Sequence, residues 1–409
     1  MPFPSGPPWR TPDVWKISFS AFFADLGYQA VLALFPLYLV LELGAPIWLF
    51  GISQALAYGP GALWGYLGGL LGDRWGRRGV AILGNAFIPL LGLIGLARTP
   101  DLAIALFILG WWARNFRTPP RRALLAESVT SEHRGEAFGF LHALDVGGGM
   151  LAAAYAFLLL LGGFPERWIL LLTILPLIFS TMFLVGVRGG RSPVRADPDS
   201  PATKVPSRAR PPRSSSQWIL GGIFSATLLY GFASYSLGFP VLTTALGTGD
   251  VALGVLVFLV FLGTSSFTGL RIGKVRRHRV LLLALGGYLV AALGSAAIAL
   301  SVVEGLGVGG YLFGAGLLGI ALGVIETHEP TLVAHLTPSD RTSRSFGVLT
   351  GSRSLGLFGA NLALGILYLA NPWYPYVYAA LGAVAAAGIL VAVGARTGDS
   401  GDLPPSAPS

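Results

Sequence analysis

The sequence predicts an all-α membrane protein with twelve transmembrane helices arranged as two pseudo-symmetric six-helix bundles. Three observations support this fold class. The chain of 409 residues is 53% hydrophobic and only 11% charged, whereas soluble domains carry about 25% charged residues. Long apolar stretches recur along the chain, and similar sequence appears twice at one fixed offset. The composition excludes a soluble enzyme of this size and an intrinsically disordered chain.

Twelve apolar stretches are long enough to cross a bilayer, because a spanning helix needs about 20 residues. The expected spans are 15–42, 47–71, 79–98, 101–125, 135–162, 167–187, 217–245, 250–271, 280–303, 307–336, 345–370 and 373–395.

The basic residues predict the orientation of these spans. The net charge is +9, and arginines gather in the turns at 74–78 and 271–279, whereas the opposite turns hold only Arg98 and Arg167. Cytoplasmic turns are the basic ones. We therefore expect a multi-pass protein of the cytoplasmic (inner) membrane with both termini in the cytoplasm. This distribution explains the basic excess without a nucleic-acid partner, and we expect a monomer in the lipid bilayer.

The composition divides the chain into four segments. Residues 1–190 are expected to form the N-terminal six-helix bundle and residues 217–396 the C-terminal one. Between them, residues 191–216 are rich in Pro, Ser and Arg. Because such a segment cannot bury a core, it is expected to be a flexible cytoplasmic linker. Residues 397–409 are expected to be a cytoplasmic tail.

An internal repeat relates the two bundles. A shift of 208 residues places Leu124 on Leu332 and Gly148 on Gly356, together with several neighbours. The repeat predicts a duplicated six-helix unit, an architecture that is common among secondary transporters.

A few charged residues fall inside the predicted spans, where a charge costs about 2.5–3.5 kcal/mol. Asp25 lies ten residues into the first helix, and Tyr28 and Gln29 share its face. This face indicates a proton carrier or a ligand for a cationic group, with a static salt bridge as the alternative. Arg114 in the fourth helix either binds an anionic substrate or balances nearby carboxylates.

The tenth helix carries two carboxylates, Glu326 and Glu329, one turn apart. Glu326 is our first candidate for proton coupling, together with Asp25. Asp145 and Arg353 occupy equivalent positions under the 208-residue shift. We predict that they form a charge pair between the halves in one conformation and separate in another.

The loop after the second helix reads GYLGGLLGDRWGRR from residue 65. It resembles the signature loop of the major facilitator superfamily, a Gly-x-x-x-Asp-Arg-x-Gly-Arg-Arg pattern. The matching residues are Gly69, Asp73, Arg74, Gly76, Arg77 and Arg78. In that family the loop latches the two halves on the cytoplasmic side. The resemblance thus implies that these residues form a cytoplasmic gate and not a substrate site.

A second string, FRTPPRRALLA from residue 116 followed by GEAFG from residue 135, resembles a poorly characterised, exporter-like prokaryotic branch of this superfamily. Arg122 replaces the Asp that is usual there. The Gly-x-x-x-Gly-Pro motif of drug antiporters is absent from the fifth helix.

The resemblance also implies which helices line the central cavity: the first, fourth, seventh and tenth. The residues expected to face the substrate are Asp25, Tyr28, Gln29, Arg114, Tyr230, Ser234 and Glu326.

Together these features predict a secondary active transporter that moves a small organic solute by alternating access, with protons coupled through Glu326 or Asp25. Multidrug-type export is one direction. The alternatives are proton-coupled uptake of an organic anion or zwitterion, and a divalent-metal permease. The sequence has no P-loop, and no metal-ligand spacing joins its five His. We therefore expect no enzymatic activity, no catalytic residue, no cofactor and no resident metal.

Overall fold

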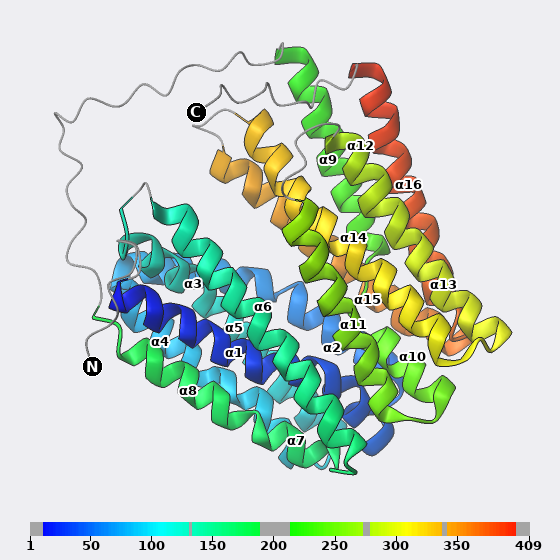
Figure 1. Ribbon diagram of the computed structural model, residues 1–409, viewed down its shortest axis with the longest axis horizontal. Coiled ribbons are helices and arrows are strands. Elements are labelled where there is room, and N and C mark those ends of the chain that lie inside the picture. The colour runs from blue at the N-terminus through cyan, green and yellow to red at the C-terminus, as the bar shows by residue number, and fades with distance from the viewer. Residues whose placement is uncertain (1–10, 131–132, 189–212, 273–278, 338–341, 398–409) are drawn as a thin grey trace. The chain divides into compact units, whose positions relative to one another are not determined.

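The computed structural model describes residues 11–130, 133–188, 213–272, 279–337 and 342–397, and every regular element in these ranges is a helix. The chain divides into two compact units. Unit 1 comprises Met1–Ala45 and Leu56–Val205, and unit 2 comprises Pro46–Ala55 and Pro206–Ser409 (Figure 1). Most of the predicted linker 191–216 and nearly all of the predicted tail 397–409 lie outside the described residues.

Unit 1 contains the helices of the first half of the chain. They are α1 (Pro12–Leu37) with its π-helical extension Tyr38–Glu42, the end of α2 (Ile47–Tyr58), α3 (Gly61–Trp75), α4 (Arg77–Phe87) with its 3-10 extension Ile88–Leu96, α5 (Pro100–Glu127), α6 (Arg134–Leu161), α7 (Glu166–Leu172) and α8 (Ile174–Val185).

Unit 2 contains the helices of the second half and the beginning of α2. They are α9 (Arg213–Ala233), α10 (Gly238–Thr248), α11 (Val251–Ile272), α12 (Arg279–Leu282) with the π-helical turn Leu283–Leu289, α13 (Val290–Glu304), α14 (Gly307–Leu336), α15 (Thr342–Ala370) and α16 (Tyr374–Thr397).

Ten helical segments in the described residues are long and apolar enough to cross a membrane. They correspond to ten of the twelve predicted spans. The other two are 47–71, which is broken where Pro60 separates α2 from α3, and 101–125, where α5 carries four arginines. The prediction of an all-α membrane protein is confirmed.

Several predicted spans are interrupted, which the hydropathy pattern does not reveal. The span 217–245 is divided into α9 and α10, because the chain leaves the helix between Ala233 and Gly238. The Ser236 amide donates to Oδ1 of Asn361 on α15 at 3.1 Å. A side chain from a neighbouring helix thus satisfies a backbone group that the break exposes, as the membrane interior requires.

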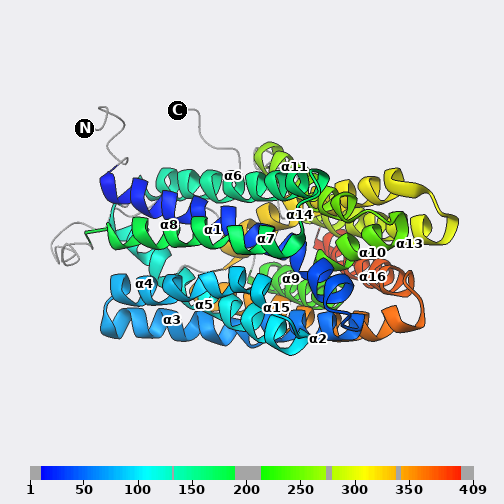
Figure 2. The same ribbon diagram turned by 90° about the horizontal axis from the view of Figure 1, so that it is seen from below.

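Glycines allow close helix contacts in unit 1. Helix α1 packs against α6 and α8, and α5 packs against α3 and α4 (Figure 2). A Cβ at Gly148 of α6 would overlap the Phe22 carbonyl of α1, and a Cβ at Gly68 of α3 would overlap the Phe116 carbonyl of α5. Small residues at such points let backbones approach closely in lipid.

Unit 2 contains a contact equivalent to the one between α1 and α6. Helix α9 packs against α15 and α16, and α11 packs against α14. Gly356 of α15 meets the backbone of Gly231 on α9. Because the 208-residue shift places Gly148 on Gly356, the same helix contact occurs at equivalent positions of both halves. This agreement supports the duplicated unit.

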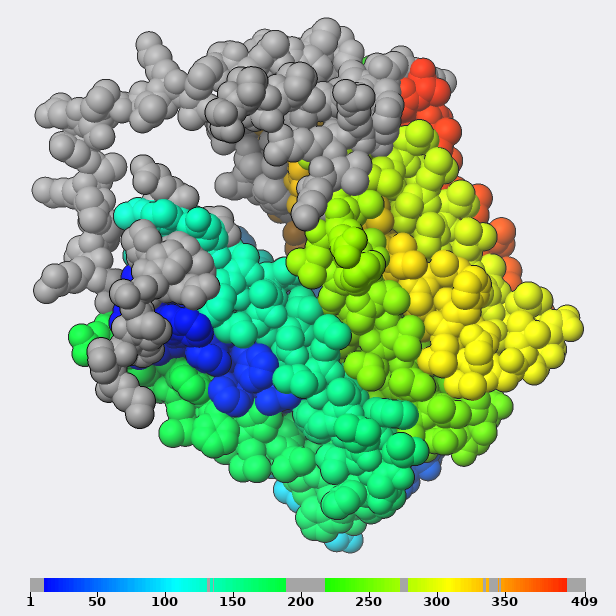
Figure 3. Space-filling view, in the orientation of Figure 1, coloured from blue at the N-terminus to red at the C-terminus, as the bar shows by residue number. Residues whose placement is uncertain are grey.

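Large apolar side chains lie on the outer surface of unit 1. Helix α6 is teal in Figure 3, and its residues Leu151, Leu158 and Leu161 are exposed. Exposed leucines along a membrane span suit contact with lipid tails, which are as apolar as leucine itself.

The contact at Gly68 provides a test of the packing. We expect Gly68→Ala to lower the melting temperature of the detergent-purified protein, because overpacking a tight contact costs about 1–3 kcal/mol. Gly139→Ala on α6 is the matched control, since no atom lies within 4 Å of the added Cβ. Equal melting temperatures for the two variants would contradict the close α3–α5 contact.

Candidate functional site

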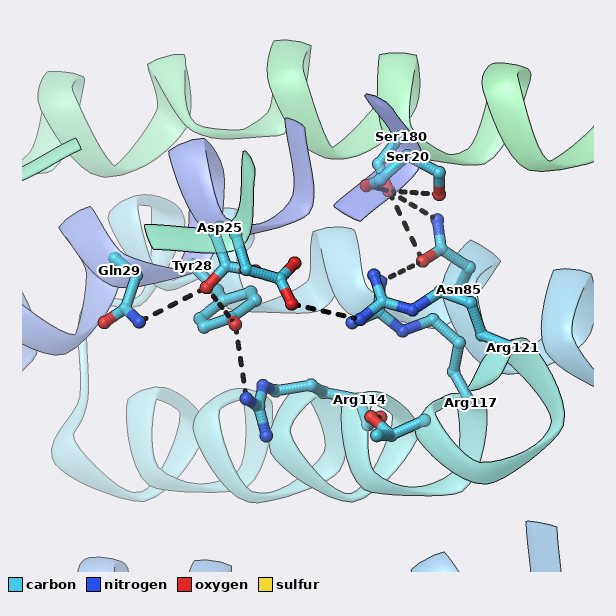
Figure 4. Close-up of polar contacts among 11 residues, drawn as sticks. Ser20, Asp25, Tyr28, Gln29, Asn85, Arg114, Arg117, Arg121 and Ser180 are labelled. Atoms are coloured by element: carbon cyan, nitrogen blue, oxygen red, sulfur yellow. Dashed lines mark hydrogen bonds and ion pairs between the residues drawn. The ribbon is translucent and has the colours of Figure 1, made fainter. Parts of the chain in front are cut away.

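A buried carboxylate, Asp25, lies within α1 of unit 1. The side-chain hydroxyl of Tyr28 donates to Oδ1 of Asp25, and Nε2 of Gln29 donates to the same oxygen at 3.3 Å (Figure 4). The three residues are one helical turn apart, so the spacing read from the sequence brings them together. Both donors to Oδ1 are neutral groups of the same helix.

Arg114 of α5 reaches the same cluster. Its Nη2 donates to the Tyr28 hydroxyl at 3.2 Å, and its Nη1 donates to Oδ1 of Asn115 at 3.3 Å. Its guanidinium carbon lies 4.7 Å from the ring centre of Tyr28 and 4.6 Å from that of Trp111. Cation–π contacts of this kind hold a guanidinium in place. Arg114 thus meets Asp25 through the Tyr28 hydroxyl.

Arg117 has a different environment, although it lies one turn from Arg114. It is 1% exposed, and its Nη1 donates to Oδ1 of Asn85 on α4 at 2.7 Å. The Asn85 amide donates to Ser180 Oγ of α8 at 3.1 Å. Figure 4 shows this chain of contacts from Arg117 through Asn85 to Ser180. Because the chain joins three helices, it ties α4, α5 and α8 together.

The third inward arginine of α5 faces α6. Nη2 of Arg121 lies 3.8 Å from Oδ2 of Asp145, and the Arg121 side chain is almost fully buried. This ion pair connects α5 to α6 inside unit 1.

Unit 2 also buries a carboxylate, and it is Glu329 of α14. Glu329 is 0% exposed and forms an ion pair with Nη2 of Arg353 on α15. Its Oε1 accepts hydrogen bonds from the Thr227 hydroxyl on α9 and from the Tyr288 hydroxyl, the latter at 2.7 Å. Tyr288 lies in the π-helical turn Leu283–Leu289, and such turns frequently occur at functional sites.

Glu326 shares the same guanidinium. It pairs with Nη1 of Arg353, but its side chain is 52% exposed. Arg353 therefore bridges two carboxylates that lie one turn apart on α14, one buried and one accessible.

Two further predicted substrate residues lie in unit 2: Tyr230 in α9 and Ser234 directly after it. The Tyr230 ring stacks on Tyr288, with ring centres 4.6 Å apart. The Ser234 hydroxyl donates to the Tyr230 carbonyl at 2.7 Å. Ser234 lies where the chain leaves α9, and its hydroxyl satisfies a carbonyl of the last turn of that helix.

The ion pairs of the two units occupy equivalent positions. Arg121 and Glu329 are 208 residues apart, and so are Asp145 and Arg353. In unit 1 the cation lies on α5, whereas in unit 2 the anion lies on the equivalent helix α14. The repeat has therefore kept the pair and inverted its signs. Asp145 and Arg353 each have a partner inside their own unit, and the predicted pair between the halves stays a prediction.

Five residues of the predicted gate lie where α3 ends and α4 begins, and Gly69 lies within α3. Nη2 of Arg77 lies 2.8 Å from Oδ1 of Asp73, and Nη1 of Arg77 pairs with Glu127 at the end of α5. Nη2 of Arg78 donates to the Val185 carbonyl of α8 at 2.8 Å. These contacts fasten the loop to two other helices of unit 1.

Glycines shape the same loop. Gly76 adopts a φ of +99°, a conformation that favours glycine, and separates α3 from α4. Gly69 faces Pro119 of α5. Arg74 is exposed.

Sequence reasoning missed the partners that come from other helices. Asn85, Glu127, Thr227 and Tyr288 each contact a candidate residue from a distant part of the chain. Asn85 is a polar residue within an apolar span, and that signal could have singled it out. The described residues contain no cluster of three or more metal-ligating side chains.

Comparison with known proteins identifies one family. The sequence matches the family described as the Major Facilitator Superfamily over residues 17–360. No curated protein matches the chain.

Solved structures share the fold at low sequence identity. A POT family transporter in complex with a thioalcohol-conjugated peptide has 13% identity and a TM-score of 0.73, over 94% of this chain and 96% of that chain. The xylose transporter XylE from E. coli, in an inward-open conformation, has 13% identity and a TM-score of 0.69, over 92% and 96%. The nucleoside transporter NupG has 12% identity and a TM-score of 0.67, over 94% and 98%. Likeness at these identities shows the fold alone.

The buried pair in unit 2 can be tested with a double-mutant cycle. Arg353→Gln should be strongly destabilising, by about 3–5 kcal/mol, because it leaves Glu329 buried and unpaired. The double variant Glu329→Gln/Arg353→Gln should lose less stability than the sum of the two single variants, as measured by thermal unfolding. Additive losses would contradict the pair.

The predicted gate can be tested through transport. We expect Arg77→Ala to change the melting temperature little, because exposed ion pairs contribute about 1 kcal/mol or less. If the loop is a gate, the same variant should change the transport rate severalfold in proteoliposomes. Arg134→Ala is the control at an exposed arginine outside this loop. Equal transport by both variants would argue against a gating role for Arg77.

Proposed function

Because the chain belongs to the major facilitator superfamily, we propose that it is a secondary active transporter which moves a small organic solute across the cytoplasmic membrane by alternating access, coupled to protons. The family and the fold indicate a transporter and not a catalytic enzyme. The identity of the solute, the coupling to protons and the direction of transport are proposed here in addition to the family.

The observation that carries the coupling proposal is the presence of carboxylates inside membrane spans of both units. Asp25 is 5% exposed and Glu329 is 0% exposed. An ionisable group at this depth is costly, and such groups commonly mark proton relays or ion pathways in transporters. A carboxylate that binds a proton loses its charge, so the helices around it can rearrange without moving a bare charge through lipid.

Glu326 is suited to exchange the proton in unit 2. Its side chain is accessible, and it shares Arg353 with the buried Glu329. When Glu326 binds a proton, its ion pair with Arg353 is lost, while Glu329 still neutralises the guanidinium. The contact between α14 and α15 would then loosen without leaving a charge unpaired.

Two directions of transport fit the proposal. Export of amphipathic compounds agrees with the resemblance of the string at 116–126 to an exporter-like branch. Uptake of an organic anion or zwitterion is the second candidate, and Arg114 favours it because the guanidinium lies beside the predicted substrate residues Tyr28 and Asp25.

The coupling can be tested in proteoliposomes that contain the purified chain and a pH-sensitive dye. We would screen a panel of candidate solutes for compounds whose uptake depends on an imposed pH gradient. Uptake of a proton-coupled solute should also change the pH of the lumen, which the dye reports. We expect Glu326→Gln to abolish accumulation driven by the pH gradient and to retain solute exchange without a gradient, since exchange needs no net proton movement.

The matched control is Glu304→Gln, which removes an exposed carboxylate at the end of α13 and should transport normally. Gradient-driven accumulation by Glu326→Gln at the wild-type level would reject the role of Glu326. Solute movement that never responds to the pH gradient in the wild-type protein would reject proton coupling itself.

A further inference from the structure

Among the described residues of unit 1, the inward-facing charges do not balance. Helix α5 contributes Arg114, Arg117 and Arg121 to the interior, and the carboxylates nearby are Asp25 of α1 and Asp145 of α6. Three cations thus face two anions. An uncompensated charge in a membrane interior is costly, so an additional anion would stabilise this cluster.

Of the three arginines, Arg114 is the one that an added anion can reach. Arg117 and Arg121 are 1% and 3% exposed, and they are engaged by Asn85 and Asp145. Arg114 is only partly buried. Within the described residues its guanidinium contacts hydroxyl and amide oxygens but no carboxylate, and its Nε is buried without a hydrogen-bond partner.

The surroundings of Arg114 hold the guanidinium ready for a ligand. The rings of Tyr28 and Trp111 lie against it at 4.7 and 4.6 Å, and Tyr58 packs against Trp111 with ring centres 5.2 Å apart. A guanidinium presents a rigid fork of N–H donors that matches a carboxylate or phosphate. Tyr28 and Trp111 are 2% and 4% exposed, so they hold the guanidinium in place, whereas the partly exposed Tyr58 offers apolar surface for the body of a ligand.

We propose that Arg114 binds the anionic group of the transported solute, a carboxylate or a phosphate, and that the Tyr28 hydroxyl links this binding to protonation of Asp25. The proposal rests on the transport function proposed above and assigns its solute to the class of organic anions, zwitterions included.

The link follows from the hydrogen bonds of the Tyr28 hydroxyl. With Asp25 ionised, the hydroxyl donates to Asp25 and accepts from Arg114. Once Asp25 carries a proton it no longer needs this donor, and the hydroxyl can rotate and donate to an anion held by Arg114. The other charged groups that act on Asp25 are Asp145 of α6 and Arg121 of α5, which are engaged with each other. A bound proton and a bound anion therefore favour one another.

The site can be tested by equilibrium binding to the purified full-length chain, with benzoate and phenyl phosphate as probes. Benzyl alcohol and benzylammonium are the neutral and cationic controls of similar shape. Binding is followed by tryptophan fluorescence, because Trp111 borders the site, and by the rise in melting temperature that a ligand produces. We expect at least one of the two anions to bind more tightly than both controls.

Variants identify the residue responsible. Arg114→Gln should weaken binding of the anion about tenfold or more, because it removes charge-assisted hydrogen bonds. Arg114→Lys should fall between this variant and the wild type, since lysine keeps the charge and lacks the planar fork. Arg134→Gln should bind like the wild type. Melting temperatures of the unliganded variants show whether each one folds. If Arg114→Gln does not fold, the weaker anion binding of Arg114→Lys tests the site instead.

The proton link has its own readout. Over a pH range in which benzoate stays ionised, its affinity for the wild type should rise as the pH falls. In Asp25→Asn the affinity should be high and independent of pH. Tyr28→Phe should bind benzoate through Arg114 and lose most of the pH dependence.

Three results would overturn the proposal: no binding of either anion to the wild type, equal affinity for benzyl alcohol, or unchanged affinity in Arg114→Gln. A pH dependence that persists in Asp25→Asn would overturn the link alone. Binding is measured without a membrane gradient, so it is independent of transport. If the chain binds an anion but transports no solute, the proposed function is wrong and the anion site at Arg114 stands. If the chain transports a neutral solute with protons and binds no anion, the anion site at Arg114 is wrong and the proposed transport function stands.

Discussion

The cost of placing a charge inside an apolar helix bundle is the constraint on which the arrangement of both units depends. An ionisable side chain in a span is stabilised by a partner, and for the ion pairs the partner lies on a neighbouring helix. In unit 1 the partner of Arg121 comes from α6, and in unit 2 the partner of Glu329 comes from α15. These contacts fix which helix faces meet, and the glycines at Gly148 and Gly356 let the adjoining helices approach closely.

The inverted signs of the ion pair give the two units different electrostatics at equivalent positions. Because α5 adds two further inward arginines, the described part of the unit 1 interior carries one more positive charge than its carboxylates neutralise. The cluster around Arg353 contains two carboxylates and one guanidinium, so it carries one more negative charge. An added anion would therefore stabilise the unit 1 cluster, and a cation such as a proton would stabilise the unit 2 cluster.

The sequence was sufficient for the fold class, for ten of the twelve predicted spans and for contacts within one helix, but not for the breaks inside spans such as 217–245. Asp25, Tyr28 and Gln29 came together as predicted, because i, i+3 and i+4 spacing is a local property. Contacts such as Asn85 with Arg117, or Tyr288 with Glu329, depend on how helices from distant parts of the chain pack. Hydropathy and charge contain no information on that packing register. For the same reason, the sequence did not show that Glu329 is buried while Glu326, one turn away on the same helix, is accessible.

The two carboxylate clusters differ in what holds the charge, and this difference assigns them different roles in the proposed cycle. Glu329 is held by an ion pair and two hydroxyls, so protonating it would leave Arg353 with one carboxylate fewer deep in the bundle. It is better suited to anchor Arg353 while the accessible Glu326 exchanges the proton.

Asp25 is held at Oδ1 by a hydroxyl and an amide, both neutral. A hydroxyl can reorient by rotation of one bond, whereas an ion pair must be pulled apart. Unit 1 can therefore respond to a proton by redirecting a hydrogen bond toward a ligand, and unit 2 responds by releasing one contact between α14 and α15.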